Sequence, residues 1–111
     1  NLDLSSFATS KDRDMNHMFN ECYFLKMIKG TIDTTNVRNM TGMFTYCYFL
    51  NATININCGT DVGFYQMFYE VATESTGNVK VNYTNATSSL ADQMIATKSP
   101  TGNIVKGELI A

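Results

Sequence analysis

The chain has 111 residues, of which 44% are hydrophobic and 12% aromatic, enough for one folded domain and too few for two ordinary ones. Eight Lys and Arg residues against ten Asp and Glu residues give a formal charge of −2, which excludes the basic surface that nucleic-acid binding requires. The longest apolar stretch, 46–50, is far shorter than the roughly 20 residues of a membrane-spanning helix, so no direct membrane insertion is expected. Asn, Thr and Ser supply most of the polarity, as in many extracellular, cell-surface and virion proteins, and a surface-exposed location is expected.

The sequence repeats itself at an interval of 25 residues. Residues 15–25 and 40–50 share seven identities at this offset, and a weaker copy at 64–71 follows a one-residue deletion near Gly63. Leu90 and Met94 keep two positions of a fourth copy. The repeat predicts a single domain of four units, 2–25, 26–50, 51–75 and 76–100, followed by a terminal strand at 101–111. The identical pairs are Met15/Met40, Met18/Met43, Phe19/Phe44, Cys22/Cys47, Tyr23/Tyr48, Phe24/Phe49 and Leu25/Leu50.

Each unit combines two periodicities. The apolar residues at 15, 18, 19 and 22 have the i, i+3, i+4, i+7 spacing of one helix face, and the spacing recurs at 40–47 and 64–71. Alternation of apolar and polar residues predicts strands at 53–57 and 79–81. Ser88 or Ser89 is expected to cap a helix that begins near Leu90. The chain is therefore predicted to be an α/β protein built from strand–helix units.

Stacked strand–helix units form a β/α solenoid, because one unit cannot bury its apolar face alone. Parallel strands lie about 4.8 Å apart, whereas packed helices need about 8–10 Å. The array is therefore expected to curve, with its parallel sheet on the inner face.

The segment 2–11, followed by Asp14-Met15, Met18-Phe19, Cys22 and Leu25, resembles the BspA-type leucine-rich repeat of bacterial surface proteins and mycoplasma lipoproteins. The second copy, 33–44, is similar to the motif over its whole length. The resemblance implies a leucine-rich-repeat-like solenoid outside the cell, used for adhesion or protein binding and without catalytic residues. Related repeats serve as structural or receptor-binding modules in phage and other virion proteins. Two departures from the motif are Asp12 at an apolar position and Lys29-Gly30 in the second strand.

No set of residues predicts catalysis, a cofactor or a metal site. His17 is the only histidine, no Gly-x-Ser-x-Gly sequence is present, and an enzyme is not expected. Cys22 and Cys47 occupy equivalent positions, but on packed helices their Cα atoms would be about 8–10 Å apart, beyond disulfide range. Free thiols are therefore expected, and Cys58 makes the count odd.

The candidate binding residues lie in two places. Asn55, Asn57, Lys80 and Asn82 fall on or beside the predicted sheet face, and Tyr46 and Tyr48 belong to an aromatic run that can present rings to solvent. The favoured function is a non-enzymatic binding or adhesion module that recognises a protein or glycan. The alternative is a structural or decoration component of a virion, phage tail or other assembly. Asn1 begins inside a repeat, so the chain is expected to be a module of a larger protein or to stack on neighbouring subunits.

Overall fold

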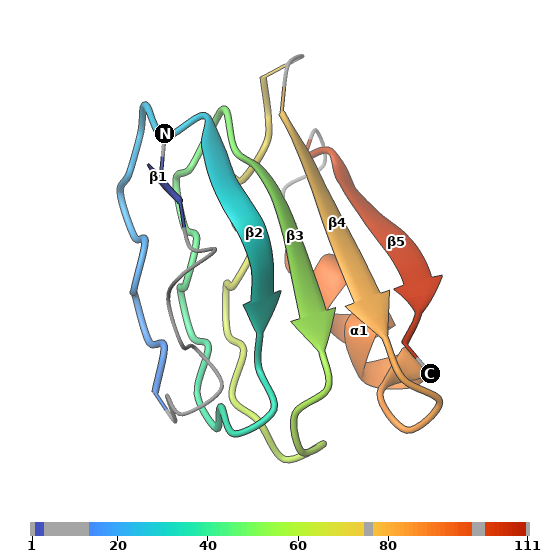
Figure 1. Cartoon of the computed structure of the whole chain (residues 1–111). Helices are drawn as coiled ribbons and strands as arrows, with labels where there is room; N and C mark the ends of the chain where they lie inside the picture. Colours follow the sequence, from blue (N-terminus) through green and yellow to red (C-terminus); the bar gives the residue numbers. More distant parts are fainter. Residues whose placement is uncertain (1, 4–13, 75–76, 99–101, 111) are drawn as a thin grey trace.

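A computed structural model describes residues 2–3, 14–74, 77–98 and 102–110. Within these residues the chain forms a parallel β-solenoid of about three turns, with one short helix. Its five-stranded sheet has the order β1-β2-β3-β4-β5, and every neighbouring pair is parallel. Figure 1 shows the sheet in front, with the return segments of the coils behind it. The strands are β1 (Leu2–Asp3), β2 (Met27–Asp33), β3 (Asn51–Ile56), β4 (Asn78–Tyr83) and β5 (Ile104–Leu109).

The alternating pattern in β3 and β4 is confirmed. Ile54, Ile56 and Val81 are fully buried, while the residues between them are half-exposed. Ile54 lies opposite Val81, so identical faces of adjacent strands meet in register. One face of the sheet therefore covers the core, and the other face, which no other described segment covers, is called the open face (Figure 1).

β2 is irregular at the position where the sequence departs from the repeat motif. Its register with β3 shifts between Met27, opposite Asn51, and Thr31, opposite Thr53. The additional residues include Gly30, whose φ of 91° belongs to a backbone conformation that residues with a Cβ rarely adopt. The extra residues therefore interrupt the regular pairing of β2 with β3 between Met27 and Thr31.

The helices predicted at 15–22, 40–47 and 64–71 are wrong. These segments are chains of tight turns, in which a left-handed residue recurs every four positions and each coil bonds to the next. Met18 N–H donates to the Met15 carbonyl within the turn, whereas Phe19 N–H donates to the Met43 carbonyl of the next coil at 2.8 Å. The left-handed residues are His17, Glu21, Gly42, Tyr46, Gln66 and Glu70, with φ between 53° and 68°.

Gly42 is the glycine among these left-handed residues, and a close contact with the neighbouring coil explains why a glycine is needed there. A Cβ on Gly42 would lie 2.5 Å from Cδ2 of the His17 ring, so the ring occupies the space that a side chain would need. His17 itself is exposed. The only histidine therefore packs across a turn of the neighbouring coil.

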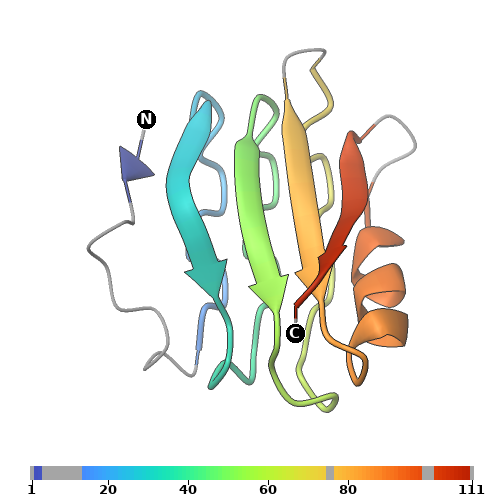
Figure 2. The same cartoon turned by 45° about the vertical axis from the view of Figure 1, so that its right-hand side comes forward.

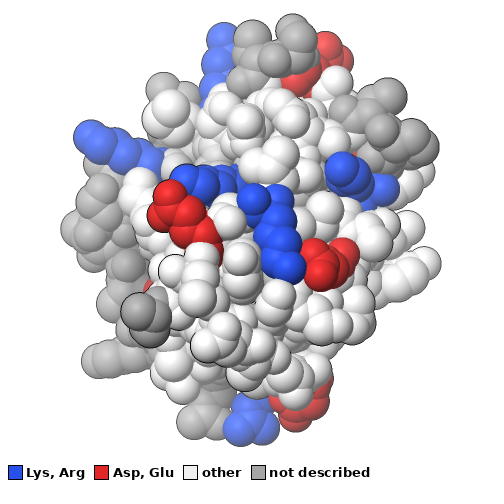
Figure 3. All heavy atoms as spheres, turned by 90° about the vertical axis from the view of Figure 1, so that its right-hand side faces the viewer, with Lys and Arg blue, Asp and Glu red and all other residues white. Residues whose placement is uncertain are grey.

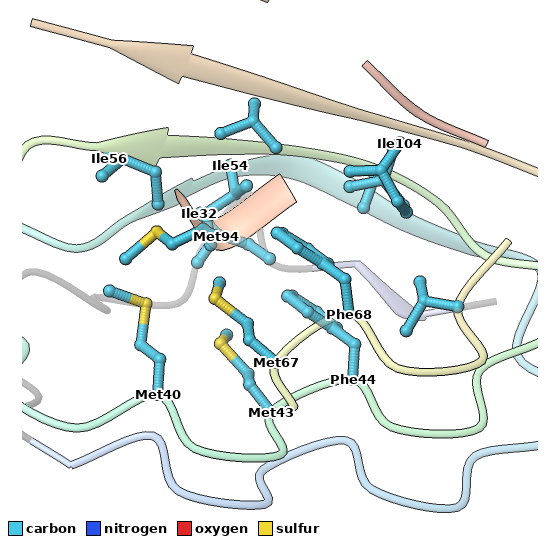
Figure 4. Close-up of a cluster of buried hydrophobic side chains, with 14 of the residues drawn as sticks. Ile32, Met40, Met43, Phe44, Ile54, Ile56, Met67, Phe68, Met94 and Ile104 are labelled. Carbon is cyan, nitrogen blue, oxygen red and sulfur yellow. The ribbon is translucent and has the colours of Figure 1, made fainter. Parts of the chain in front are cut away.

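The turns bury the same apolar residues that a helix would bury. Phe19, Phe44 and Phe68 stack through three successive coils, with ring centroids 5.5 and 5.9 Å apart and nearly parallel planes. Figure 4 shows the rings of Phe44 and Phe68 stacked in the same orientation, with Met43 and Met67 side by side. Because hydrogen bonds join adjacent coils on this side as well as in the sheet, both sides share one spacing. The reason for expecting a curved array with an inner sheet is therefore missing from these coils.

The fourth predicted unit does contain a helix. Helix α1 (Ser88–Ile95) lies behind β4 and β5 and buries Leu90, Ala91 and Met94 (Figure 2). Its N-cap residue is Thr87, not Ser88 or Ser89. A strand followed by a helix is thus found at 78–95, and the described residues form about three solenoid turns, which do not confirm the four-unit division.

Asparagine and threonine side chains bond successive coils together at the corners. Asn51 Nδ2 donates to the Lys26 carbonyl, and Asn103 Nδ2 donates to the Gly77 carbonyl, in each case across one coil. Buried Thr34 donates through Oγ1 to the Asn55 carbonyl at 2.6 Å. The composition rich in Asn and Thr is therefore partly a requirement of the fold, because corner backbone groups need partners.

Candidate functional site

The open face of the sheet carries three of the predicted binding residues. Asn55 and Asn82 lie opposite each other on β3 and β4, and Asn82 Nδ2 donates to Asn55 Oδ1 at 3.0 Å. Asn82 Oδ1 accepts from the Glu108 backbone N–H at 2.8 Å. Lys80 Nζ lies 3.6 Å from the Glu108 carboxylate, and both side chains are exposed. These contacts hold a row of polar groups in fixed positions on the surface.

A shallow hollow lies beside this polar row. It has a volume of about 500 Å³, and its lining includes Gly30 and the irregular stretch of β2. Met27 contributes an exposed apolar side chain to it, and Lys80 borders it. The hollow and the polar row together give the open face both shape and hydrogen-bonding groups. Its lining residues are Met27, Ile28, Lys29, Gly30, Thr31, Asn51, Ala52, Thr53, Asn78 and Lys80.

Asn57 is separate from this face. It follows the end of β3, its Oδ1 accepts from the Thr34 backbone N–H at 3.2 Å, and its own backbone N–H donates to Thr34 Oγ1 at 3.3 Å. Its side chain is thus engaged in joining two coils. The alternation that placed Asn55 outward does not extend to Asn57, because the strand ends at Ile56.

Tyr46 and Tyr48 belong to a second surface, carried by the return segments. Their ring centroids are 6.2 Å apart, and Tyr23 lies 6.3 Å from Tyr46 and 5.8 Å from Tyr48. Tyr69 adds a fourth ring at 5.9 Å from Tyr46. We call these four residues the tyrosine cluster. Tyr23 is 40% exposed, and the other three are half-buried.

Sequence reasoning missed two members of the tyrosine cluster. The 25-residue offset placed Tyr23 over Tyr48 and was a usable signal for the first. Tyr69 has no tyrosine counterpart in the other copies, so nothing in the repeat pointed to it. Its proximity to Tyr46 follows from the hydrogen bond between the Tyr46 N–H and the Tyr69 carbonyl, 3.1 Å long.

Charges at the β5 edge are mixed in sign. Lys106 Nζ lies 3.1 Å from Asp92 of α1 and 4.5 Å from the centroid of the Tyr83 ring. Figure 3 shows basic and acidic side chains side by side on this part of the molecule. Neither sign dominates, so this edge presents no strong field to a charged ligand.

The three cysteines are free thiols, as expected, although the argument from helix packing was wrong. Cys47 is fully buried and its Sγ lies 3.1 Å from the Phe19 carbonyl of the preceding coil. Burial, followed by the nearby Cys22 thiol, raises the pKa of Cys47 to about 12. Burial also raises the pKa of Cys58. Both groups are therefore poor nucleophiles at neutral pH.

Two further observations concern the whole described part of the chain. No three His, Cys, Asp or Glu side chains among the described residues are grouped so that they could hold a metal ion. No helix in that part is long and apolar enough to span a membrane.

The fold and these surfaces define a class: a parallel β-solenoid with one open sheet face and an aromatic cluster on its return segments. The chain belongs to the family described as Mycoplasma protein of unknown function, DUF285, whose model matches residues 1–104. No curated protein and no solved structure matches the chain.

Proposed function

We propose that the chain is a non-enzymatic binding module, displayed outside the cell, that contacts a protein or glycan through the open face of its sheet. The observation that carries this proposal is the uncovered face itself. Parallel sheets are ordinarily covered on both faces, whereas here one face is left with ordered polar groups around Asn55, Lys80 and Asn82 beside a hollow. An exposed, shaped surface of this kind is suited to contact with another molecule.

The resemblance to the BspA-type leucine-rich repeat supports the same proposal. Proteins with that repeat are surface proteins used in adhesion, and the family found for this chain is a mycoplasma family. A cell-surface location fits the resemblance and the sequence's low content of charged residues, 16%.

The test uses the full chain against a printed glycan array and a panel of purified extracellular glycoproteins. Thr53→Arg fills the hollow with a charged side chain, and Lys80→Ala removes an exposed cation; both should weaken any binding at least fivefold without lowering the midpoint of urea unfolding. Gln93→Arg, on the exposed side of α1, is the matched control. Binding that survives Thr53→Arg and Lys80→Ala unchanged would exclude the sheet face as the contact.

A second candidate function is a structural component of a larger assembly, such as a virion or phage tail. The outer edge of β5 favours it, because Val105 and Leu109 are 41% and 52% exposed there and an edge strand can pair with another chain. Light scattering over a concentration series tests this function. Concentration-dependent association that Val105→Lys abolishes would support it, and a monomer at every concentration would contradict it.

A further inference from the structure

The tyrosine cluster is flanked by acidic residues at a repeated position of the solenoid. Glu21, Tyr46 and Glu70 are the left-handed residues of the same turn in three successive coils, with φ of 63°, 68° and 57°. Adjacent coils are joined there by two hydrogen bonds, from Glu21 N–H to the Thr45 carbonyl at 2.8 Å and from Tyr46 N–H to the Tyr69 carbonyl at 3.1 Å. Equivalent positions are therefore about 4.8 Å apart. One glutamate lies on each side of Tyr46 along the stack.

The rings of the cluster contact one another and leave no cage between them. Tyr23 and Tyr48 are stacked with an interplanar angle of 20°, while Tyr46 and Tyr69 meet edge to face at 67°. A ligand must therefore lie on the outer side of the rings. Phe24, beside Tyr23 in the chain, is 83% exposed. Such a surface of angled rings offers several π faces and no single flat platform.

The acidic groups beside the rings have no cationic partner in the described part of the chain. Ion pairs there join Lys80 to Glu108 and Lys106 to Asp92, and neither involves Glu21 or Glu70. Partial burial raises the pKa of Tyr48, and the Glu70 carboxylate raises it further. Carboxylates and aromatic faces both attract cations, and they attract a planar guanidinium best.

We propose that the tyrosine cluster, with Glu21 and Glu70, is an interaction surface for an arginine-containing segment of a partner protein. In this proposal the guanidinium stacks on the outer face of a tyrosine ring and donates a hydrogen bond to a flanking carboxylate. A neutral glycan is a poorer match, because its hydroxyls are neutral donors to the carboxylates, whereas a guanidinium makes charge-assisted hydrogen bonds to them. This surface lies on the return segments, apart from the sheet face proposed above, so either proposal can fail while the other stands.

The experiment titrates the full chain with a blocked hexa-arginine peptide by calorimetry at low and physiological salt. The double variant Glu21→Gln/Glu70→Gln keeps the rings and removes the charges; we expect it to weaken binding about tenfold, the equivalent of two modest charge contacts. Tyr48→Ser should weaken binding about fivefold. Should Tyr48→Ser fail to fold, the glutamate variant still decides, because both of its changes are at charged side chains outside the core.

Matched controls separate this surface from general attraction between opposite charges. Asp14→Asn/Asp61→Asn changes the net charge by the same amount at exposed sites elsewhere, and Tyr65→Ser removes a 71% exposed tyrosine outside the cluster. Both controls should change the affinity less than twofold. Equal losses in the control and test variants, or no binding of the peptide, would overturn the proposal. Binding of neutral maltohexaose in place of the peptide, lost in Tyr48→Ser, would overturn it in favour of a glycan surface.

Discussion

Two regions of this solenoid bury an apolar stripe behind the sheet in different ways. In the return segments at 15–22, 40–47 and 64–71, amides donate to the next coil, as Phe44 N–H does to the Met67 carbonyl at 3.3 Å. In α1 they donate within the helix, whose first turn begins with the bond from Ala91 N–H to the Thr87 carbonyl at 2.8 Å. The backbone N–H groups of the turns can therefore bond to an adjacent coil, whereas those of the helix are already paired within the helix.

This difference explains where the ladder of hydrogen-bonded turns ends. In the second return segment, alternate backbone N–H groups donate to carbonyls of the third segment. The equivalent N–H groups of the third segment are those of Phe64, Gln66, Phe68 and Glu70. Within the described part of the chain only one of them has a partner, Phe68 N–H, which donates to Thr97 Oγ1 at 3.0 Å. A helix satisfies its own backbone and packs about 8–10 Å away, so no further coil can join the ladder behind it. The helix therefore ends the turn ladder, while the sheet continues to β5.

The largest predicted effect tests the core of the turn region. Phe44 is fully buried between the rings of Phe19 and Phe68, so Phe44→Ala should lower the free energy of unfolding by about 3–5 kcal/mol. Urea unfolding followed by circular dichroism measures it. Phe24→Ala, at an 83% exposed position, is the control and should change stability by less than about 0.5 kcal/mol. A similar loss for both variants would contradict the stacked core.

A second prediction concerns the Cys47 thiol, which the turn ladder encloses against the Phe19 carbonyl. Its pKa is raised from 9.0 to about 12 in the folded chain, so between these values the unfolded chain loses a proton that the folded chain keeps. Unfolding is thus favoured as pH rises, by up to about 1.4 kcal/mol per pH unit. The free energy of unfolding from pH 8.5 to 10.5 should fall more steeply for the native chain than for Cys47→Ala. Parallel curves would show that the thiol is not enclosed.

The third prediction makes the same change in both regions. Gln66 has a φ of 53°, which costs a residue with a Cβ about 1–2 kcal/mol, so Gln66→Gly should stabilise the chain by about 0.5–1 kcal/mol after the added backbone entropy. Gln93 lies within α1, where the same change should destabilise by about 1 kcal/mol. Thermal and urea unfolding of the pair would reveal the opposite signs. Destabilisation by both changes would mean that 64–71 is helical after all.

The sequence contained enough information for the strands and too little for the segments behind them. Alternation around Ile54 and Val81 located β3 and β4 because strands place successive side chains on opposite faces. The i, i+4 recurrence of Met15 and Phe19 is shared by a helix and by turns that repeat every four residues. Glycine would have distinguished them, but it occupies only Gly42 among the left-handed positions of these turns.

The sequence predicted those parts of the candidate surfaces that depend only on strand alternation and on the 25-residue repeat. Alternation placed Asn55, Lys80 and Asn82 on the open face. The hollow beside them is lined in part by the stretch of β2 where the register shifts, and alternation alone does not predict such a shift. The tyrosine cluster depends on coils that are one hydrogen bond apart, whereas the predicted helices would have held these rings about twice as far from each other.

The position of β1 and β5 at opposite edges of the sheet has a mechanical consequence. Tension applied between these edges acts along the interstrand hydrogen bonds, which then break one row at a time. Each coil that detaches frees about 25 residues, or about 85 Å of extended chain, and the coils that remain keep their own contacts. The molecule would lengthen in steps under load, as an extensible tether does, rather than rupture in a single event.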